Sequence, residues 1–453
     1  MPWFERPAGT QKVVNWKTNL VALWASQFIS LSAFSFCLPF MALYLRESGI
    51  VPPDKAAQWS GILQSVSSVS MVVFAPIWGM LGDKYGRKMM LVRANLAGGF
   101  VLYLTALVEN VEALIVLRIL HGAFTGTVAA AQSLVATNTP DRNQGFAIGV
   151  IMAAVSAGQA AGNFFGGLCA EHFGPVVSFK VGGVMLLVST VMVVFSVKET
   201  FVRPEPLPHP TPSVRIRRRQ ESVNNFKSGL PILGVVSLVS FVQVYDGPFL
   251  PLYIDSLYAA AQGIVATAPD GAIDGRVYGL TGTVGLVATI AAMIGSTAAG
   301  VLMDRKIPPW VWVVLPALCG AGALWIALQP TFWGLVAGRS LFLMISSSLA
   351  SVVIVVLGRM TPNSRRGAAM GWSQAARSVG WSTSPILGAL ISQRFGWMNA
   401  FLVLAGLTAL LIPAFIFLHR RYQQAFLPME EDPPSITPVA DNEVSKPGGQ
   451  GRV

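Results

Sequence analysis

The sequence is poor in cysteine and in charge. It contains three cysteines in 453 residues, Cys37, Cys169 and Cys319, each alone in an apolar segment. An odd number of isolated cysteines offers neither a disulfide framework nor a cysteine metal site. Charged residues make up 12% of the chain, whereas a soluble protein averages about 25%. These shortages exclude a small disulfide-rich secreted domain and disfavour a soluble globular one.

Motifs for enzymatic chemistry are also missing. The chain has no glycine-rich phosphate loop of the Walker type, so nothing in it supports ATP-driven work. It shows no catalytic dyad and no metal-binding cluster. We therefore expect a protein that is not an enzyme and that holds no metal or other cofactor.

Long apolar segments take the place of the missing charge. Hydrophobic residues make up 53% of the chain, and the mean hydropathy is +0.58. A membrane-spanning helix needs about 20 mainly apolar residues. Twelve such segments are present: 19–45, 58–81, 90–108, 112–136, 146–170, 175–197, 230–254, 276–302, 310–328, 331–357, 368–392 and 397–418. The first is too long for a cleavable signal peptide, so we predict that it stays as an anchor in an all-α polytopic membrane protein.

The distribution of positive charge predicts the orientation in the membrane. If the N-terminus is inside, 24 of the 32 Lys and Arg residues lie in cytoplasmic segments, four lie outside and four lie within helices. Such a bias is the usual sign of cytoplasmic loops. We therefore predict that both termini are cytoplasmic. The net charge of +11 then reflects topology, and we expect no nucleic-acid partner.

The longest polar connection divides the chain into two halves. It is rich in proline and then in arginine, which is typical of an extended linker lying near anionic lipid headgroups. The predicted parts are a cytoplasmic N-terminus (1–18), a six-helix bundle (19–197), the linker (198–229), a second six-helix bundle (230–418) and a disordered cytoplasmic tail (419–453).

The two halves repeat one another. Pro39 and Tyr44 recur 209 residues later as Pro248 and Tyr253. Five glycines recur 222 residues later: Gly145, Gly149, Gly158, Gly166 and Gly174 as Gly367, Gly371, Gly380, Gly388 and Gly396. A repeat of two six-helix halves is typical of secondary transporters, which bind substrate between the halves at mid-membrane.

A polar segment between the second and third apolar segments is the most specific motif. Residues 79–88 read GMLGDKYGRK. This pattern resembles the signature loop of the major facilitator superfamily. The resemblance extends over residues 15–420 and is nearest to the twelve-helix drug:proton antiporters, especially the MdtG-like multidrug exporters of bacteria. It implies twelve transmembrane helices in two pseudo-symmetric bundles.

The resemblance implies that this loop is a conformational latch. Asp83 is expected to face a helix N-terminus or an arginine in one conformation of the carrier. The alternative is a plain positive turn at the membrane surface. The second copy lacks the Gly-Arg-Lys ending, so we expect Asp83 to matter more than Asp304. The predicted latch residues are Gly79, Asp83, Lys84, Gly86, Arg87, Lys88, Asp304 and Arg305.

The fifth segment carries the pattern that the resemblance associates with antiporters. Its glycines are Gly149, Gly158, Gly162, Gly166 and Gly167. Asn163 stands where the antiporter motif has proline, so we expect no kink there. Glycines at these spacings let a partner helix approach closely, and ordinary helix packing is the alternative reading.

Three charged residues lie inside predicted helices and are candidates for proton coupling. Arg118 lies about 10 Å inside the hydrocarbon, and Arg339 is its counterpart in the tenth segment. Asp246 lies about 24 Å along the seventh helix from Leu230. We predict that Asp246 pairs with one of these arginines and exchanges it for a proton. The alternatives are a structural ion pair or a wetted carboxylate for Asp246, and an Arg118 that reaches the outer headgroups.

The substrate is expected to be a small amphiphile. Aromatic and amide side chains suit loose recognition of such compounds. The predicted cavity residues are Gln27, Phe34, Gln64, Gln132, Gln243, Tyr245, Trp372 and Arg377. The excess of interior arginine over acid favours neutral, zwitterionic or anionic compounds.

Together these features predict an inner-membrane exporter that works by proton antiport and alternating access. Its expected partners are the substrate, protons and membrane lipids, and we expect a monomer. A facilitator for a metabolite such as a sugar or siderophore is the first alternative. A receptor without transport activity is the second.

Overall fold

The structure is a computed structural model that describes residues 15–140, 143–199, 229–263, 273–303, 308–361 and 366–423. Within these ranges the regular structure is helical. The predictions for the chain's first 14 residues, most of the linker and the tail beyond residue 423 lie outside the described residues. The helices of the two halves run from Trp16 to Ser196 and from Gly229 to Arg421.

The N-terminal half contains six membrane segments, two of them divided. The first comprises α1 with the short turn η1 and α2, and the fourth comprises α5 with α6. The helices are α1 (Trp16–Ser35), η1 (Leu38–Phe40), α2 (Met41–Glu47), α3 (Ala56–Tyr85), α4 (Arg87–Thr105), α5 (Val111–Phe124), α6 (Thr127–Asn138), α7 (Gln144–Phe173) and α8 (Pro175–Ser196).

The C-terminal half repeats this order. Its first segment is the helix Gly229–Val244 followed by α10. Its last two segments are joined at non-helical Gly396, and Leu410 separates α14 from α15. The helices are α10 (Leu250–Ala261), α11 (Arg276–Met303), α12 (Val311–Leu328), α13 (Phe332–Met360), α14 (Arg366–Ala409) and α15 (Leu411–Arg421).

The prediction of twelve spans agrees with this architecture. Nine helices of the described chain are long and apolar enough to cross a membrane. The other spans are α4, the divided segment 229–261, and the span gained by dividing Gly371–Arg421 at Gly396, whose φ is +82°. The result is an all-α bundle of two six-helix halves.

Three segments that the sequence predicted to be single helices, 19–45, 112–136 and 230–254, are interrupted. In the first, α1 ends at Ser35, and the short turn η1 separates it from α2. In the fourth segment, Gly126 has φ +125°, a left-handed value that glycine tolerates, and α5 ends just before it. In the seventh, residues 245–249 form a turn. Pro248 lacks an N–H and cannot continue the helical hydrogen bonding, and Gly247 precedes it. The prediction of one uninterrupted helix over 230–254 is therefore wrong.

The first and fifth segments of each half pack through glycine in the same register. A methyl group on Gly158 would lie 2.5 Å from the carbonyl oxygen of Phe28. One on Gly380 would lie 2.5 Å from that of Ser237. These pairs are related by the sequence repeat, and a second related pair of contacts joins Gly166 to Phe36 and Gly388 to Tyr245. The repeat is therefore a repeat of backbone contacts.

The two halves meet along two seams that the repeat also relates. One joins α3 to α14, where a methyl group on Gly61 would lie 2.6 Å from the carbonyl oxygen of Pro385. The other joins α7 to α11, where one on Gly282 would lie 2.5 Å from the carbonyl oxygen of Asn163. Gly61 and Gly282 are 221 residues apart, and Asn163 and Pro385 are 222 apart. Both seams need glycine because two backbones touch there.

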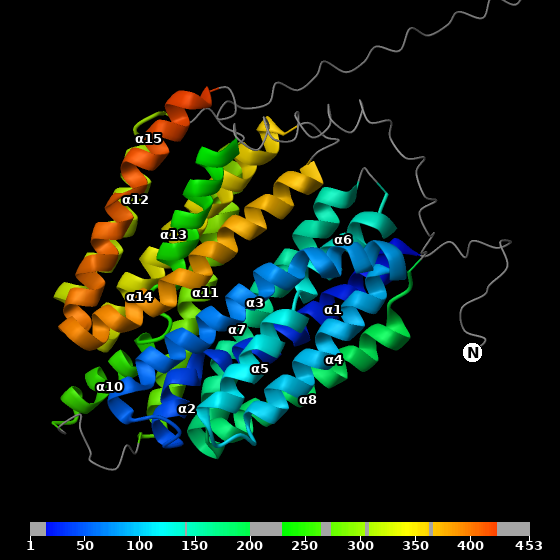
Figure 1. Ribbon diagram of the computed structural model, residues 1–453. Helices are drawn as coiled ribbons and strands as arrows, with labels where there is room; N and C mark the ends of the chain where they lie inside the picture. The colour runs from blue at the N-terminus through cyan, green and yellow to red at the C-terminus, as the bar shows by residue number, and fades with distance from the viewer. Residues whose placement is uncertain are drawn as a thin grey trace, which may run out of the picture.

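Two polar contacts between the halves lie toward the end of the molecule that carries α2 and α10, here called the α2–α10 end. Figure 1 shows α2 and α10 close together there, with α6 and α15 at the opposite end. Arg46 of α2 donates to Asp255 of α10 across 2.6 Å. Tyr278 donates to Glu47 across 2.5 Å. These contacts hold the halves together at this end.

The glycine contacts lead to a stability prediction with an internal control. Gly158→Val is expected to lower the free energy of unfolding by about 1–3 kcal/mol, because the new side chain would meet the α1 backbone. Gly149→Val makes the same change on the same helix, where no atom lies within 4 Å of the new Cβ. Thermal unfolding of the two purified variants in detergent checks this. Equal midpoints would contradict it.

Candidate functional site

An ion pair lies inside the C-terminal half. Arg339 of α13 donates through Nη1 to Oδ2 of Asp246, which lies in the turn that divides the seventh segment. The Asp246 side chain is 2% exposed and that of Arg339 is 14% exposed. A pair this far from water stabilises only while both charges are present, because either one alone would be buried without compensation. The structure thus pairs Asp246 with Arg339.

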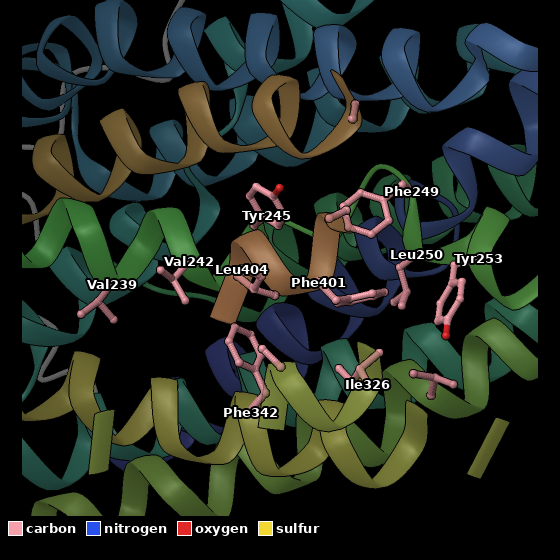
Figure 2. Packing of buried hydrophobic residues seen from close by; sticks show 14 of the residues in the cluster. Val239, Val242, Tyr245, Phe249, Leu250, Tyr253, Ile326, Phe342, Phe401 and Leu404 are labelled. Carbon is pink, nitrogen blue, oxygen red and sulfur yellow. The ribbon is translucent and has the colours of Figure 1, made fainter. Parts of the chain in front are cut away.

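The break in the seventh segment positions the Asp246 carboxylate. Leu250 is the first residue of α10, directly after the turn. Its N–H donates to the Asp246 carbonyl oxygen at 2.8 Å. The neighbouring rings of Tyr245 and Phe249 meet edge-on at 5.9 Å, and Phe249 meets Phe401 at 5.4 Å. Figure 2 shows these rings in the packed interior of the half. Apolar packing therefore surrounds the turn.

Gln64 of the other half reaches this turn. A methyl group on Gly247 would lie 3.6 Å from Gln64 Oε1. Gln64 belongs to α3, which forms one of the two seams, and its side chain is exposed. The ion pair therefore lies next to the boundary between the halves, where a relative movement of the halves would change its surroundings.

Arg118 forms a different cluster in the N-terminal half. It is 3% exposed, and its guanidinium contacts His121 Nδ1 at 3.1 Å and Thr105 Oγ1 at 2.9 Å. His121 stacks on Phe34 with ring centroids 5.3 Å apart. No described carboxylate lies within ion-pair distance of Arg118. Arg118 does not reach the surface, so the alternative of an outward-reaching arginine is wrong.

The segment predicted as a latch loop is shorter than expected. Residues 79–85 complete α3, and α4 begins at Arg87. The whole reversal takes place at Gly86, whose φ is +97°. A side chain there would be strained, and it would also lie 2.9 Å from Glu199 Oε2. Only glycine fits this position.

Glu199 is a residue that the sequence analysis missed. Its carboxylate accepts from the backbone N–H groups of Arg87 at 2.7 Å and Lys88 at 2.9 Å. A carboxylate at a helix N-terminus satisfies free N–H groups and opposes the positive end of the helix dipole. Glu199 lies three residues after the end of α8 at Ser196, and an acid just after a membrane helix was the only available signal. It ties the end of α8 to the start of α4.

The remaining latch residues fall into two groups. Arg87 donates to the Ser133 carbonyl oxygen at 3.1 Å, and Lys88 donates to that of Val194 at 2.8 Å. These bonds connect α4 to α6 and α8. Gly79 and Lys84 are exposed on α3. The side chain of Asp83, and all of Asp304 and Arg305, lie outside the described residues, so the asymmetric latch stays a prediction.

The glycines of the fifth segment serve two interfaces. Gly158, Gly162 and Gly166 face the α1 backbone, whereas Gly149 faces open space. Gly167 faces α11 of the other half, where a methyl group would lie 2.6 Å from the Tyr278 carbonyl oxygen. As expected from the missing proline, α7 runs unbroken from Gln144 to Phe173.

Asn163 gives the seam between α7 and α11 a polar contact. Its Nδ2 donates to Thr289 Oγ1 of the other half at 3.3 Å. An apolar pocket of about 350 Å³ lies beside this contact and is lined by both helices, including Phe164, Phe165 and Ile290. The sequence analysis did not find this pocket, because its two walls are more than 100 residues apart in the chain.

The predicted cavity residues are not gathered in one place by any described contact. Gln27 and Tyr245 are fully buried, and no partner is described for their side-chain polar atoms. Gln64 and Trp372 are exposed, and Phe34 and Gln243 are half-buried. Gln132 contacts the Met152 sulfur at 3.1 Å, and Arg377 lies 6.0 Å from the Trp381 ring centroid. Their role in a substrate cavity stays a prediction.

Comparison with known proteins identifies the class. The family model of the Major Facilitator Superfamily matches residues 23–269 and 257–448. The chain therefore belongs to this superfamily, and it is a membrane transporter and not an enzyme. This confirms the resemblance that the motif at residues 79–88 indicated.

Relatives narrow the class further. The chain is 29% identical over 404 residues to Multidrug resistance protein MdtG of Escherichia fergusonii, covering 88% of this chain and 94% of that protein. It is 28% identical over 405 residues to the protein of the same name from Escherichia coli strain SMS-3-5, with the same coverage. With these relatives and its apolar helices, the chain is a multi-pass inner-membrane protein of MdtG-like sequence.

Solved structures share the fold at low sequence identity. A bacterial homolog of the human lysosomal transporter Spinster, in an inward-facing and occupied conformation, has a TM-score of 0.71 at 13% identity, covering 92% of this chain and 99% of that chain. The nucleoside transporter NupG has a TM-score of 0.68 at 13% identity, covering 88% and 99%. At this identity the likeness shows the fold alone.

The ion pair leads to a prediction about stability. Arg339→Met is expected to lower the free energy of unfolding by about 3 kcal/mol, because it leaves the Asp246 carboxylate buried without its partner. Asp246→Leu/Arg339→Met removes both charges and should recover most of that loss. Thermal unfolding in detergent measures both. A double variant no more stable than Arg339→Met alone would contradict the interpretation.

Proposed function

We propose that this transporter exports small amphiphilic compounds in exchange for protons. The Asp246–Arg339 pair is the observation that carries the proposal. A carboxylate buried beside an arginine can take a proton only by giving up that partner, and this links protonation to a rearrangement of charge. The names of the relatives and the fifth-segment glycines support export of drug-like compounds. The proton gradient would be the energy source, with no bound cofactor.

The distribution of positive charge supports an orientation with both termini in the cytoplasm. The α2–α10 end then faces outward, because the connections at that end carry few Lys and Arg residues. The contacts of Arg46 with Asp255 and of Tyr278 with Glu47 would close the transporter on its outer side. The conformation described would accordingly be inward-facing.

Alternating access would be a rocking of the halves about the two seams. Outward opening would require the Arg46–Asp255 contact to part. In that state Asp246 would take a proton from outside and release Arg339, and the compound would leave. On return to the inward-facing state the proton would leave, and the Asp246–Arg339 pair would form again. The pair present in this conformation supports that order of events.

The proposal predicts separate effects on driven and undriven transport. Asp246→Asn is expected to reduce dye efflux against a gradient at least about tenfold, because the amide cannot carry a proton. Exchange of dye down its own gradient should continue. Vesicles with an imposed pH gradient measure both, and Asp274→Asn makes the same change in an outer connection as a control. Undiminished driven efflux in Asp246→Asn would favour the alternative of a facilitator.

The outer contact predicts a reversible block. Arg46→Cys/Asp255→Cys, made in a background with the three native cysteines replaced by serine, places one thiol on each half at the α2–α10 end. A short bifunctional thiosulfonate reagent with a reducible link should stop transport, because the halves can no longer part. Reduction should restore it. Each single-cysteine variant serves as a control, and transport that continues through full cross-linking would contradict alternating access.

A further inference from the structure

The repeat gives the Asp246–Arg339 pair a counterpart in the N-terminal half. Phe36 and Tyr245 contact corresponding glycines and are 209 residues apart. The residues that follow them in the two halves are Cys37 and Asp246. The position of the acid in one half is thus the position of a thiol in the other.

The two arginines correspond equally closely. The helix that carries Arg118 begins with the cap Asn110, which accepts from the Ala113 N–H at 2.8 Å. The helix that carries Arg339 begins with the cap Thr331, which accepts from the Gly334 N–H at 3.0 Å. Each arginine follows its cap by eight residues. In the N-terminal half, Arg118 and Cys37 therefore occupy the positions that Arg339 and Asp246 occupy in the C-terminal half.

Because a thiol stands in the N-terminal half where the C-terminal half has an acid, no described carboxylate compensates the charge of Arg118. Cys37 is fully buried, and its sulfur contacts the Ala33 carbonyl oxygen at 3.6 Å. Thr105 and His121, the two partners of Arg118, supply no negative charge. The Arg118 Nε has no described partner. A guanidinium buried in a membrane without a counter-charge is costly. Such a group is retained where an anion meets it at some stage.

We propose that Arg118 binds an anionic group of the transported compound, such as a carboxylate. That group would take at Arg118 the place that the Asp246 carboxylate takes at Arg339. This inference rests on the proposed function and names its substrate class: amphiphiles that carry a negative group. Cys37 is the residue that sets this preference, because a neutral side chain there leaves Arg118 open to an external anion.

The depth of Arg118 fits this role. It lies about 10 Å along α5 from Val111, near the α2–α10 end. In the present conformation Phe34 stacks on His121, and the Tyr44 hydroxyl donates to the Thr105 carbonyl oxygen at 3.2 Å, so both rings lie beside the partners of Arg118. The proposal requires that Arg118 becomes accessible when the two halves part at the α2–α10 end. The anionic group then reaches Arg118 in the conformation from which the compound leaves.

The test supplies the missing carboxylate from the protein itself. The probes are a fluorescent dye with one carboxylate and its methyl ester, transported into vesicles by the native protein, Cys37→Asp and Cys37→Ser. The native protein should prefer the acid over the ester by about tenfold in apparent affinity, as expected for a charge-assisted hydrogen bond. Cys37→Ser should keep this preference. Cys37→Asp should lose the preference for the acid, because the new carboxylate would pair with Arg118 and block the anionic group of the dye.

The outcomes separate this inference from the proposed function. Equal transport of acid and ester by the native protein, or an unchanged preference in Cys37→Asp, overturns the anion site and leaves proton-coupled export standing. No driven transport of either dye by the native protein overturns the proposed function itself. If Cys37→Asp does not fold, thermal unfolding of the native protein with each dye decides: stabilisation by the acid alone supports the site, and equal stabilisation overturns it.

Discussion

The absence of water inside the membrane is the constraint on which the rest of this structure depends. Apolar side chains gain little by facing each other instead of lipid, so helices associate where their backbones can touch. Gly158 and Gly380 provide this contact within the halves, and Gly61 and Gly282 provide it between them. Each contact in one half has its counterpart in the other, so the same physical solution is used twice.

The same constraint governs charge. Asp246 and Arg339 compensate one another away from water, and Arg46 and Asp255 do so where the halves meet at the α2–α10 end. Arg118 has no such partner among the described residues. The halves are therefore alike in their packing and unlike in their charge. In the proposed mechanism this difference divides the work, with the proton bound in one half and the anionic group in the other.

Interruptions of the helices place the polar groups. The turn at residues 245–249 takes Asp246 out of the helical repeat and brings it to Arg339, beside the seam that contains Gln64. Gly86 compresses a reversal into one residue, so that Glu199 can hold the start of α4. Pro248 and Gly86 thus act through the backbone. Their effect on function is to position side chains that are distant in sequence.

The sequence by itself determined the fold class, the twelve spans and the repeat, because hydrophobic length and glycine spacing are local properties that the membrane enforces. It also singled out Asp246 and two arginines as membrane-embedded charges. Only the tertiary structure decided that Asp246 pairs with Arg339 and that Arg118 meets His121 and Thr105. It alone revealed the Glu199 cap and the cross-half bond of Asn163. These contacts join segments far apart in the chain, and their geometry depends on how the helices are broken and tilted, which no local pattern specifies.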